Sequence, residues 1–171
     1  NCVVINGVSK CYAMTGWRLG YIAADAEIVK QVAKLQGQST SNPCSISQAA
    51  SIEALTGPHD DVKEMVRQFE KRRDIVVKML TAIPGVACNK PKGSFYSFPD
   101  FSGLYGKKDG NGKTLNGSLE FTEYLLTTKK VAIVPGIAFG ADNHARLSFA
   151  ASLDKIKEGI KRIQEAVELL K

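Results

Sequence analysis

The sequence predicts an α/β protein, and three observations support that fold class. Short apolar segments rich in β-branched residues occur at 2–8 and 19–24. Residues 61–84 keep apolar side chains at the three- and four-residue spacing of an amphipathic helix, with Pro84-Gly85 at its end. Beyond residue 85, strand-like and helix-like segments alternate, which is typical of helices packed over a sheet. A chain of 171 residues is long enough to bury a hydrophobic core.

The two apolar segments near the start are predicted to be buried strands that bracket a loop. Asp25 is predicted to cap a helix over residues 26–36, which Gly37 ends. Residues 38–43 are polar and end at a proline, so we expect an ordered loop there.

A second helix is predicted from Ser45, because Ser45 and Gln48 have the spacing of a capping box. Gly57-Pro58 is expected to stop it. The long helix over residues 61–84 then follows.

In the second half of the chain, a helix is predicted near residues 119–128 and a closing helix from about Asp154, with Ser152 as its cap. Residues 103–117 contain several glycines and little periodicity, so a surface excursion is expected. Four strands are predicted, at 86–89, 94–98, 131–134 and 145–149.

Charge and hydropathy exclude two classes of function. The formal net charge is +6, but the basic residues are scattered, and Lys71-Arg72-Arg73 is followed at once by Asp74. There is no basic stripe interleaved with aromatic residues, so nucleic-acid binding is not predicted. No apolar run approaches the roughly 18 residues of a membrane span.

The four cysteines show neither a CxxC pair nor the spacing of a disulfide framework, which indicates reduced thiols in a cytoplasmic protein. No metal site is predicted, since His59 and His144 do not lie at ligand spacing from them. The first residues, Asn-Cys-Val-Val-Ile-Asn, lack the features of a signal peptide and are typical of mid-strand sequence. We therefore expect a longer protein, and a targeting peptide upstream stays open.

The run from Ser9 to Arg18 carries the chemistry. It places Lys10 and Arg18 eight positions apart, with a hydroxyl before the lysine and Gly16 between them. A lysine amine forms an imine with an aldehyde, and a hydroxyl and a guanidinium bind phosphate. Gly16 is expected to supply a tight turn that folds Arg18 back towards Ser9. Arg18 is expected to lie in a buried stretch because Trp17, Leu19 and Tyr21 surround it.

Residues 9–20 resemble the Schiff-base lysine motif of class I aminotransferases, which are pyridoxal-phosphate enzymes of fold type I. The pattern Ser-Lys-x-Tyr-Ala-Met-Thr-Gly-Trp-Arg-Leu-Gly is matched at nearly every position. The resemblance implies that Lys10 forms the Schiff base with pyridoxal 5'-phosphate and moves the proton between substrate and cofactor. It also implies that Ser9 and Arg18 hold the cofactor phosphate. Tyr12 and Trp17 are expected to be packing residues.

Arg146 is the candidate substrate-binding residue. Residues 134–140 and 145–150 resemble the carboxylate-binding segment of the same family. There, an arginine of the small domain pairs with the substrate α-carboxylate. Taken without the family, an arginine between Ala145 and Leu147 is equally well an edge-strand residue with its head group in water.

The resemblance extends over all 171 residues and implies the C-terminal part of a fold type I transferase. Residues 1–60 would be the end of the large cofactor-binding domain, 61–84 a long interdomain helix, and 85–171 a small α/β domain. The implied reaction is transamination of an amino acid, with aspartate preferred and 2-oxoglutarate as acceptor. The implied assembly is a homodimer, with Asn42 in a loop near the neighbouring subunit.

Two other classes of function stay open. One is a pyridoxal-phosphate lyase or synthase on the same scaffold, which would share Lys10, Arg18 and Arg146. The other is a chain without activity that serves as a folded or dimerising scaffold. It is a real alternative, because in the family the groups that stack on the cofactor ring and bind its pyridine nitrogen precede the lysine. This chain alone is therefore expected to hold an incomplete cofactor site.

Overall fold

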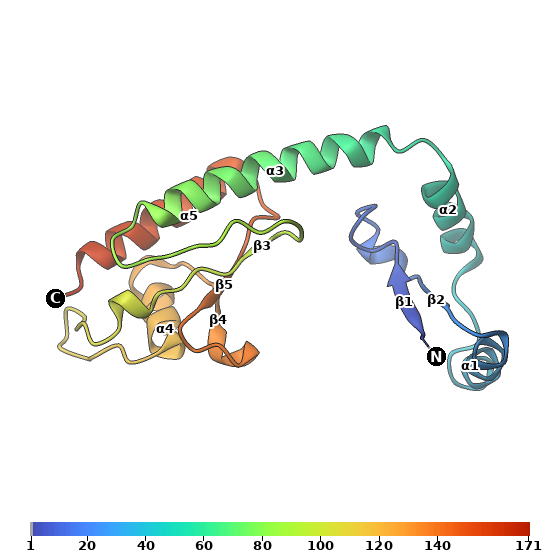
Figure 1. Ribbon diagram of the computed structural model, residues 1–171, viewed down its shortest axis with the longest axis horizontal. Coiled ribbons are helices and arrows are strands. Elements are labelled where there is room, and N and C mark those ends of the chain that lie inside the picture. The colour runs from blue at the N-terminus through green and yellow to red at the C-terminus, as the bar shows by residue number, and fades with distance from the viewer. Residues whose placement is uncertain (1) are drawn as a thin grey trace. The chain divides into compact units, whose positions relative to one another are not determined.

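The computed structural model describes residues 2–171. Contacts within the chain divide it into two compact units, which we name the N-terminal unit, residues 1–65, and the C-terminal unit, residues 66–171. In the N-terminal unit two strands precede consecutive helices, and in the C-terminal unit strands and helices are interspersed, as Figure 1 shows for the chain from its blue to its red end. Among the described residues, no helix combines the length and the apolar character needed to span a membrane.

The N-terminal unit begins with a two-stranded antiparallel ribbon. Strand β1 (Val4–Gly7) pairs with β2 (Gly20–Ala23), so that Val4 faces Ala23 and Gly7 faces Gly20. The predicted strands are therefore present, but the prediction that they are buried is wrong. Ile5 is 79% exposed, because within the described residues each strand pairs only with the other and no layer covers them.

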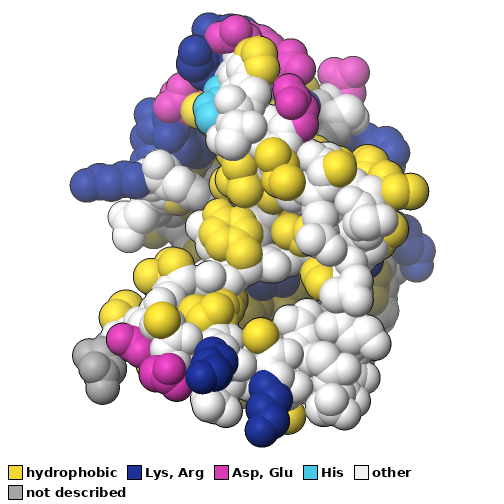
Figure 2. Space-filling model, turned by 90° about the vertical axis from the view of Figure 1, so that its right-hand side faces the viewer, with side chains coloured by type: hydrophobic (Ala, Val, Ile, Leu, Met, Phe, Trp, Pro, Cys, Tyr) yellow, Lys and Arg dark blue, Asp and Glu magenta, His cyan; other side chains and the backbone are white. Residues whose placement is uncertain are grey.

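Large apolar side chains of this unit reach the surface from several elements. Hydrophobic side chains gather on one face in Figure 2, with charged side chains around them. Those of β1 and of the next two helices include Val4, Ile5, Val29, Val32, Leu35, Ile46, Ile52 and Leu55. Apolar area of this extent favours association with further protein surface.

Helix α1 spans Ala26–Ser39, and its predicted cap is confirmed, because the Asp25 carboxylate accepts a hydrogen bond of 3.0 Å from the Glu27 backbone N–H. The prediction that Gly37 ends it, with a loop from residue 38, is wrong. The helix continues to Ser39, and the Thr40 N–H donates to the Gln36 carbonyl at 2.9 Å. A helical glycine costs only about 1 kcal/mol, which the surrounding turns offset.

Helix α2 spans Ser45–Thr56 and ends as predicted at Gly57, whose N–H donates to Glu53. The predicted capping box is wrong. Cys44 is the N-cap residue, and the Gln48 side chain donates to the Pro43 carbonyl at 2.9 Å instead. Residue Ser45 is already inside the first turn.

Helix α3 spans Asp60–Thr81, and its residues from Val66 onward belong to the C-terminal unit. Asp60 and Asp61 lie in its first turn, where acidic side chains stabilise a helix N-terminus. Val76 and Leu80 are fully buried, which confirms the apolar stripe in the last two turns of the helix, whereas Val66 of the same stripe is 51% exposed.

The C-terminal unit is a small α/β arrangement. Its three-stranded antiparallel sheet has the order β3 (Tyr96–Ser97), β5 (Ala145–Ser148), β4 (Val134–Pro135), so β5 is central. Helices α4 (Ser118–Lys129) and α5 (Leu153–Glu168) complete it. The Ser152 hydroxyl accepts a hydrogen bond from Lys155, as the sequence predicts for this cap.

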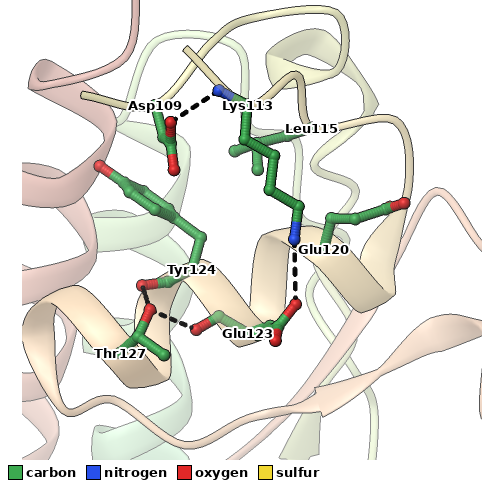
Figure 3. Close-up of a pocket in the computed structure, with 7 residues that line it drawn as sticks. All are labelled: Asp109, Lys113, Leu115, Glu120, Glu123, Tyr124 and Thr127. Carbon is green, nitrogen blue, oxygen red and sulfur yellow. Dashed lines mark hydrogen bonds and ion pairs between the residues drawn. The ribbon is translucent and has the colours of Figure 1, made fainter. Parts of the chain in front are cut away.

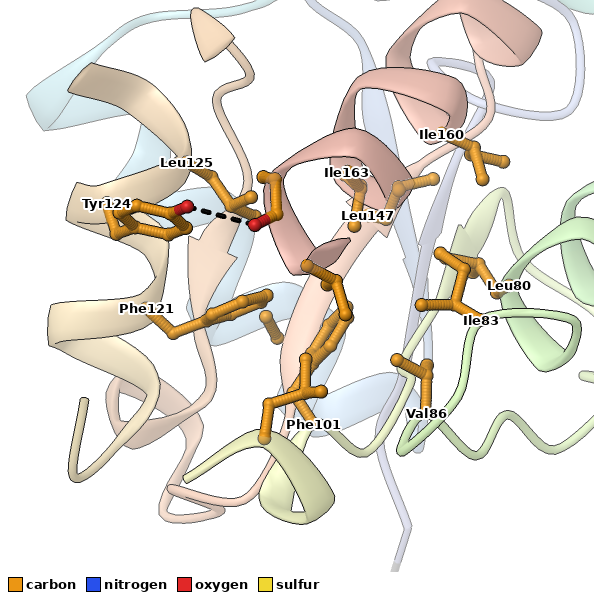
Figure 4. Close-up of a cluster of buried hydrophobic side chains, with 14 of the residues drawn as sticks. Leu80, Ile83, Val86, Phe101, Phe121, Tyr124, Leu125, Leu147, Ile160 and Ile163 are labelled. Atoms are coloured by element: carbon orange, nitrogen blue, oxygen red, sulfur yellow. Dashed lines mark hydrogen bonds between the residues drawn. The ribbon is translucent and has the colours of Figure 1, made fainter. Parts of the chain in front are cut away.

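One hydrophobic cluster joins these elements (Figure 4). Its members come from α3, α4, α5, β5 and the connecting segments, and include Leu80, Ile83, Phe101, Phe121, Leu125, Leu147, Ile160 and Ile163. The Phe101 and Phe121 rings lie 4.6 Å apart between centroids. This core fixes the sheet on which the substrate candidate Arg146 lies.

Three predicted segments differ from the structure. In residues 86–89, Ala87 makes only an isolated bridge with Asp100, and residues 131–133 form no strand. Residues 103–117 are not a pure surface excursion, because Leu104 and Leu115 are almost fully buried. Backbone bonds close this loop on itself, which lets two apolar side chains reach the core.

Candidate active site

The run of residues 8–19 connects the two strands of the ribbon. Because Gly7 pairs with Gly20, Ser9 and Arg18 each lie two residues beyond that pair, at the same end of the ribbon. A Cβ atom on Gly7 would lie 3.1 Å from the Leu19 carbonyl oxygen, and one on Gly20 would lie 3.2 Å from that of Asn6. Glycine at both positions therefore allows this close approach of the strands, which a Cβ atom would push apart by a few tenths of an ångström.

The run folds into consecutive turns. Val8 and Met14 are buried, the Ala13 N–H donates to the Lys10 carbonyl at 3.2 Å, and residues Thr15–Trp17 form one turn of 3-10 helix. Gly16 lies within this tight turn, in which the Trp17 N–H donates to the Met14 carbonyl at 3.2 Å, and the turn needs no left-handed conformation at Gly16. Ala13 and Arg18 supply the left-handed turns, with φ of 54° and 53°.

Left-handed conformations cost a non-glycine residue of the order of 1 kcal/mol, and such residues concentrate at functional sites. One of the two here is Arg18, the predicted phosphate-binding residue. Strain in the backbone therefore coincides with the residue that the motif singles out.

Arg18 lies at the surface, so the prediction of a buried stretch is wrong. Trp17 is 43% and Tyr21 is 39% exposed, because in the N-terminal unit few side chains are covered. One guanidinium nitrogen of Arg18 donates to the Thr15 carbonyl at 3.0 Å. A guanidinium has five N–H donors, so this contact leaves donors for an anion. Lys10 is exposed and Ser9 half-buried.

Tyr12 contacts the aromatic ring of His59, at 6.1 Å between centroids, which agrees with a packing role. The Asn42 side chain donates to the Pro43 carbonyl at 3.0 Å, so its contact in this chain is a local one. Neither Tyr12 nor Asn42 carries a charge, so neither adds a charged group to those of Lys10 and Arg18.

Arg146 lies on β5, where it faces Val134 of β4. Its neighbours Ala145 and Leu147 are buried and point to the core, and Arg146 is half-buried on the opposite face. The edge-strand alternative is wrong, since β5 is the central strand of its sheet.

Two aromatic rings contact the Arg146 guanidinium. Its carbon lies 4.4 Å from the centroid of Tyr96 and 4.7 Å from that of Phe139. Among residues 2–171, no carboxylate forms an ion pair with it. A half-buried cation of this kind offers an unneutralised charge to a carboxylate ligand.

The sequence interpretation gave no role to Tyr96 or to Phe139, although Phe139 lies in the segment 134–140 that it singled out. The pairing of β3 with β5 is what places Tyr96, which lies opposite Ser148, two residues from Arg146 and on the same face of β5. Ser94, just before β3, has a φ of 68°. Phe139 ends the 3-10 helix Gly136–Phe139, which precedes β5.

A cavity of about 140 Å³ lies elsewhere in the C-terminal unit, and Figure 3 shows its lining. Most of its polar side chains already have partners within the chain. The Asp109 carboxylate accepts the backbone N–H groups of Asn111 and Lys113, and the Lys113 amine lies 3.2 Å from Glu123. None of the predicted site residues lines it. In residues 2–171, no three metal-binding side chains cluster in a way that could hold a metal ion.

A family model described as aminotransferase class I and II matches residues 1–163. The chain belongs to this family. It is 46% identical to the probable aspartate/prephenate aminotransferase of Rickettsia typhi, covering 97% of the chain and 42% of that relative. It is 47% identical to the aspartate aminotransferase of Rhizobium meliloti, covering 98% of the chain and 41% of that relative. The aminotransferase chain thus spans about two fifths of the length of these curated relatives.

Solved structures agree with the fold. The crystal structure of the Rhizobium meliloti aspartate aminotransferase matches 99% of this aminotransferase chain with a TM-score of 0.97, at 47% identity, over 42% of its own length. The aromatic aminotransferase of Pyrococcus horikoshii matches 97% with a TM-score of 0.86, at 34% identity, over 43% of its length. The predicted fold class, the C-terminal part of a fold type I transferase, is confirmed.

Class I aminotransferases use pyridoxal phosphate. The residues at the end of the ribbon fit such a group, because Lys10 provides an amine for an aldehyde, and Ser9 and Arg18 provide donors for a phosphate. The first acidic residue of the aminotransferase chain is Asp25, so no carboxylate in the Ser9–Arg18 run repels an anion.

Proposed function

We propose that the whole protein is a pyridoxal-phosphate-dependent aminotransferase that transfers the amino group of an amino acid, preferably aspartate, to 2-oxoglutarate. One observation carries the proposal above all others. In a chain of this family, the β1–β2 register brings an amine, a hydroxyl and a guanidinium to one end of a ribbon. The names of the bacterial relatives support aspartate as the donor.

Each residue has its own part. Ser9 and Arg18 hold the phosphate, Arg18 through paired N–H donors that a lysine could not supply. Lys10 would hold the cofactor through its Nζ amine, and the same amine would take the proton from the substrate α-carbon and pass it to the cofactor. Bound pyridoxal phosphate supplies an electron sink for that carbon.

Arg146 binds the substrate α-carboxylate. Its position on a central strand, its two aromatic contacts and its lack of an ion pair in the described chain support this assignment. A fork of N–H groups fixes a carboxylate in one orientation, which aligns the α-carbon bond that is to be broken.

The proposal extends to the organisation of the whole protein. Residues 1–60 end the large domain, residues 61–84, most of which belong to α3, link the two domains, and 85–171 form the small domain. The protein is a cytoplasmic homodimer, in which the loop around Asn42 approaches the neighbouring subunit. The exposed apolar side chains of β1, α1 and α2 support burial against further protein.

An amino-group balance tests this function against a lyase or synthase. The purified whole protein is incubated with aspartate and pyridoxal phosphate, with and without 2-oxoglutarate, and all products are quantified. With 2-oxoglutarate, we expect glutamate and oxaloacetate in equal amounts. Without it, the amount of oxaloacetate should not exceed one equivalent of the enzyme. Sustained turnover of aspartate without an oxo acid would assign the protein to the lyases and overturn the proposal.

A further inference from the structure

The Arg146 guanidinium has ring neighbours instead of a carboxylate partner, and these rings are themselves held in place. We propose that Tyr96 and Phe139 are positioning residues, which orient the Arg146 guanidinium for a carboxylate, and that a Ser118–Asp142 hydrogen bond holds Phe139 in position. The inference rests on the proposed function, because it takes the α-carboxylate as the ligand of Arg146.

Both ring contacts lie inside the distance at which a cation is attracted to an aromatic ring, about 6 Å. The guanidinium carbon is 4.4 Å from the Tyr96 centroid and 4.7 Å from the Phe139 centroid. Contact with a ring consumes no N–H donor, whereas an ion pair would. The rings can therefore restrict the motion of Arg146 and still leave its fork for a ligand.

The Tyr96 ring is fixed by its strand. Tyr96 pairs with Ser148 of β5, and its ring lies 4.3 Å from that of Phe95 between centroids. Phe95 in turn packs against the hydrophobic core, and its carbonyl accepts the Phe149 N–H at 2.9 Å. This side of the guanidinium is therefore tied to the core of the C-terminal unit.

The Phe139 ring is 47% exposed and lies in a one-turn helix, and the Phe98 ring contacts it at 6.0 Å between centroids. The backbone around Phe139 is held by Ser118, the first residue of α4. The Ser118 hydroxyl donates to the Asp142 carboxylate at 2.6 Å and accepts the Ile137 N–H at 3.1 Å. Asp142 also accepts the Ser118 N–H at 2.9 Å. These bonds tie residues on both sides of Phe139 to α4.

Glycine permits this close arrangement. A Cβ on Gly136 would clash with the carbonyl oxygens of Ala141 and His144, and one on Gly117 would lie 2.7 Å from an oxygen of Asp142. The Tyr105 hydroxyl adds a bond of 2.7 Å to the Asp142 carbonyl. The segment that carries Phe139 is thus closed on itself and bonded to α4 and to Tyr105.

The test measures how tightly succinate, a dicarboxylate without an amino group, binds to the whole protein loaded with pyridoxal phosphate. Titration calorimetry gives the dissociation constant without any turnover. Phe139→Leu removes the ring and keeps an apolar side chain, whereas Phe139→Tyr keeps the ring. Phe98→Leu is the control, because it removes an exposed ring that contacts Phe139 at 6.0 Å between centroids but, among the described residues, has no contact with Arg146. It separates the loss of a ring on the guanidinium from a general change of this face.

We expect Phe139→Leu and Tyr96→Leu each to weaken succinate binding about 5-fold, from the strength of partly exposed cation–π contacts. Phe139→Tyr and Phe98→Leu should stay within about 2-fold of the unchanged protein. In kinetics with aspartate, the two Leu variants should raise KM more than they lower kcat. Ser118→Ala should also weaken succinate binding. The double variant Ser118→Ala/Phe139→Leu should bind succinate about as well as Phe139→Leu alone, because Ser118 acts through Phe139.

The Arg146→Lys variant separates the role of the two rings from the role of Arg146 itself. Arg146→Lys is measured in the same titration, and unchanged succinate binding there would remove Arg146 from the substrate site altogether. If Arg146→Lys weakens binding but both Leu ring variants bind as the unchanged protein does, the rings do not position Arg146. Equal losses in Phe139→Leu, Phe139→Tyr and Phe98→Leu would likewise overturn the inference, since they show a general effect of altering this face.

Discussion

The Arg146 guanidinium lies 4.4 Å from the centre of the Tyr96 ring on the neighbouring strand. The residue that the sequence singles out as a carboxylate binder thus contacts a ring that lies outside its own motif. Its charge stays unpaired within the described residues, which distinguishes it from an arginine that supports the fold through an ion pair.

Replacing Arg146 with lysine keeps the charge but loses the two-pronged contact. We expect kcat/KM for aspartate in the whole protein to fall by the equivalent of about 2–4 kcal/mol, since two charge-assisted hydrogen bonds are lost or distorted. The melting temperature should change little, because Arg146 makes no ion pair in the described chain. Activity within a few-fold, combined with markedly earlier melting, would instead make Arg146 a structural residue.

The stability of the C-terminal unit should fall at alkaline pH because of Tyr105. Burial, with a contribution from the Asp142 and Asp100 carboxylates, raises the pKa of Tyr105 to about 12 from an ordinary 10.0. Since the folded pKa is the higher one, the stabilisation is complete below pH 10.0 and is lost as the pH rises towards 12. Urea unfolding between these pH values should show a decline in stability that is smaller in Tyr105→Phe. Parallel declines in both proteins would contradict this.

The cluster around Phe121 should dominate the stability of the C-terminal unit. Phe121 is fully buried and contacts the Phe101 ring, so Phe121→Ala is expected to destabilise the protein by about 3–5 kcal/mol. Leu126→Ala, on an exposed position of the same helix, is the control and should cost less than about 1 kcal/mol. Similar unfolding midpoints for the two variants would show that the core lies elsewhere.

The 171-residue chain alone should bind pyridoxal phosphate weakly. Ser9, Lys10 and Arg18 together offer one charge-assisted phosphate contact and a hydroxyl, of the order of 2–4 kcal/mol before entropic losses. Spectroscopic titration should give a dissociation constant above the micromolar range, and sedimentation should show self-association through the exposed β1 side chains. Micromolar or tighter binding by this chain would show that its cofactor site is complete.

Local patterns allowed most of the fold to be predicted. Asp25 and Ser152 cap their helices as the sequence indicates, and the apolar periodicity of α3 and α5 marks the faces that are buried. Errors occurred where a local signal is weak compared with its surroundings. Gly37 does not end α1, because the cost of one glycine is smaller than the gain from the turns around it.

The parts of the site that depend on contacts between residues far apart in the sequence could not be predicted from it. Lys10, Ser9 and Arg18 lie in one contiguous run, so a motif was sufficient to find them. Tyr96 is fifty residues from Arg146 in the chain, and only the pairing of β3 with β5 brings the two side chains to one face. Nothing in the local sequence around Arg146 encodes that pairing. Likewise, the left-handed turns at Ala13 and Arg18 depend on the closure of the whole β1–β2 connection.

Lys10 is the residue that we propose to bind pyridoxal phosphate covalently. The whole protein, loaded with the cofactor, is reduced with borohydride, digested and analysed by peptide mass spectrometry. We predict a pyridoxyl phosphate mass on the peptide that contains Lys10, and no label and no turnover in a folded Lys10→Ala variant. Label on another lysine in the unchanged protein, or undiminished transamination by Lys10→Ala, would show that Lys10 is not that residue.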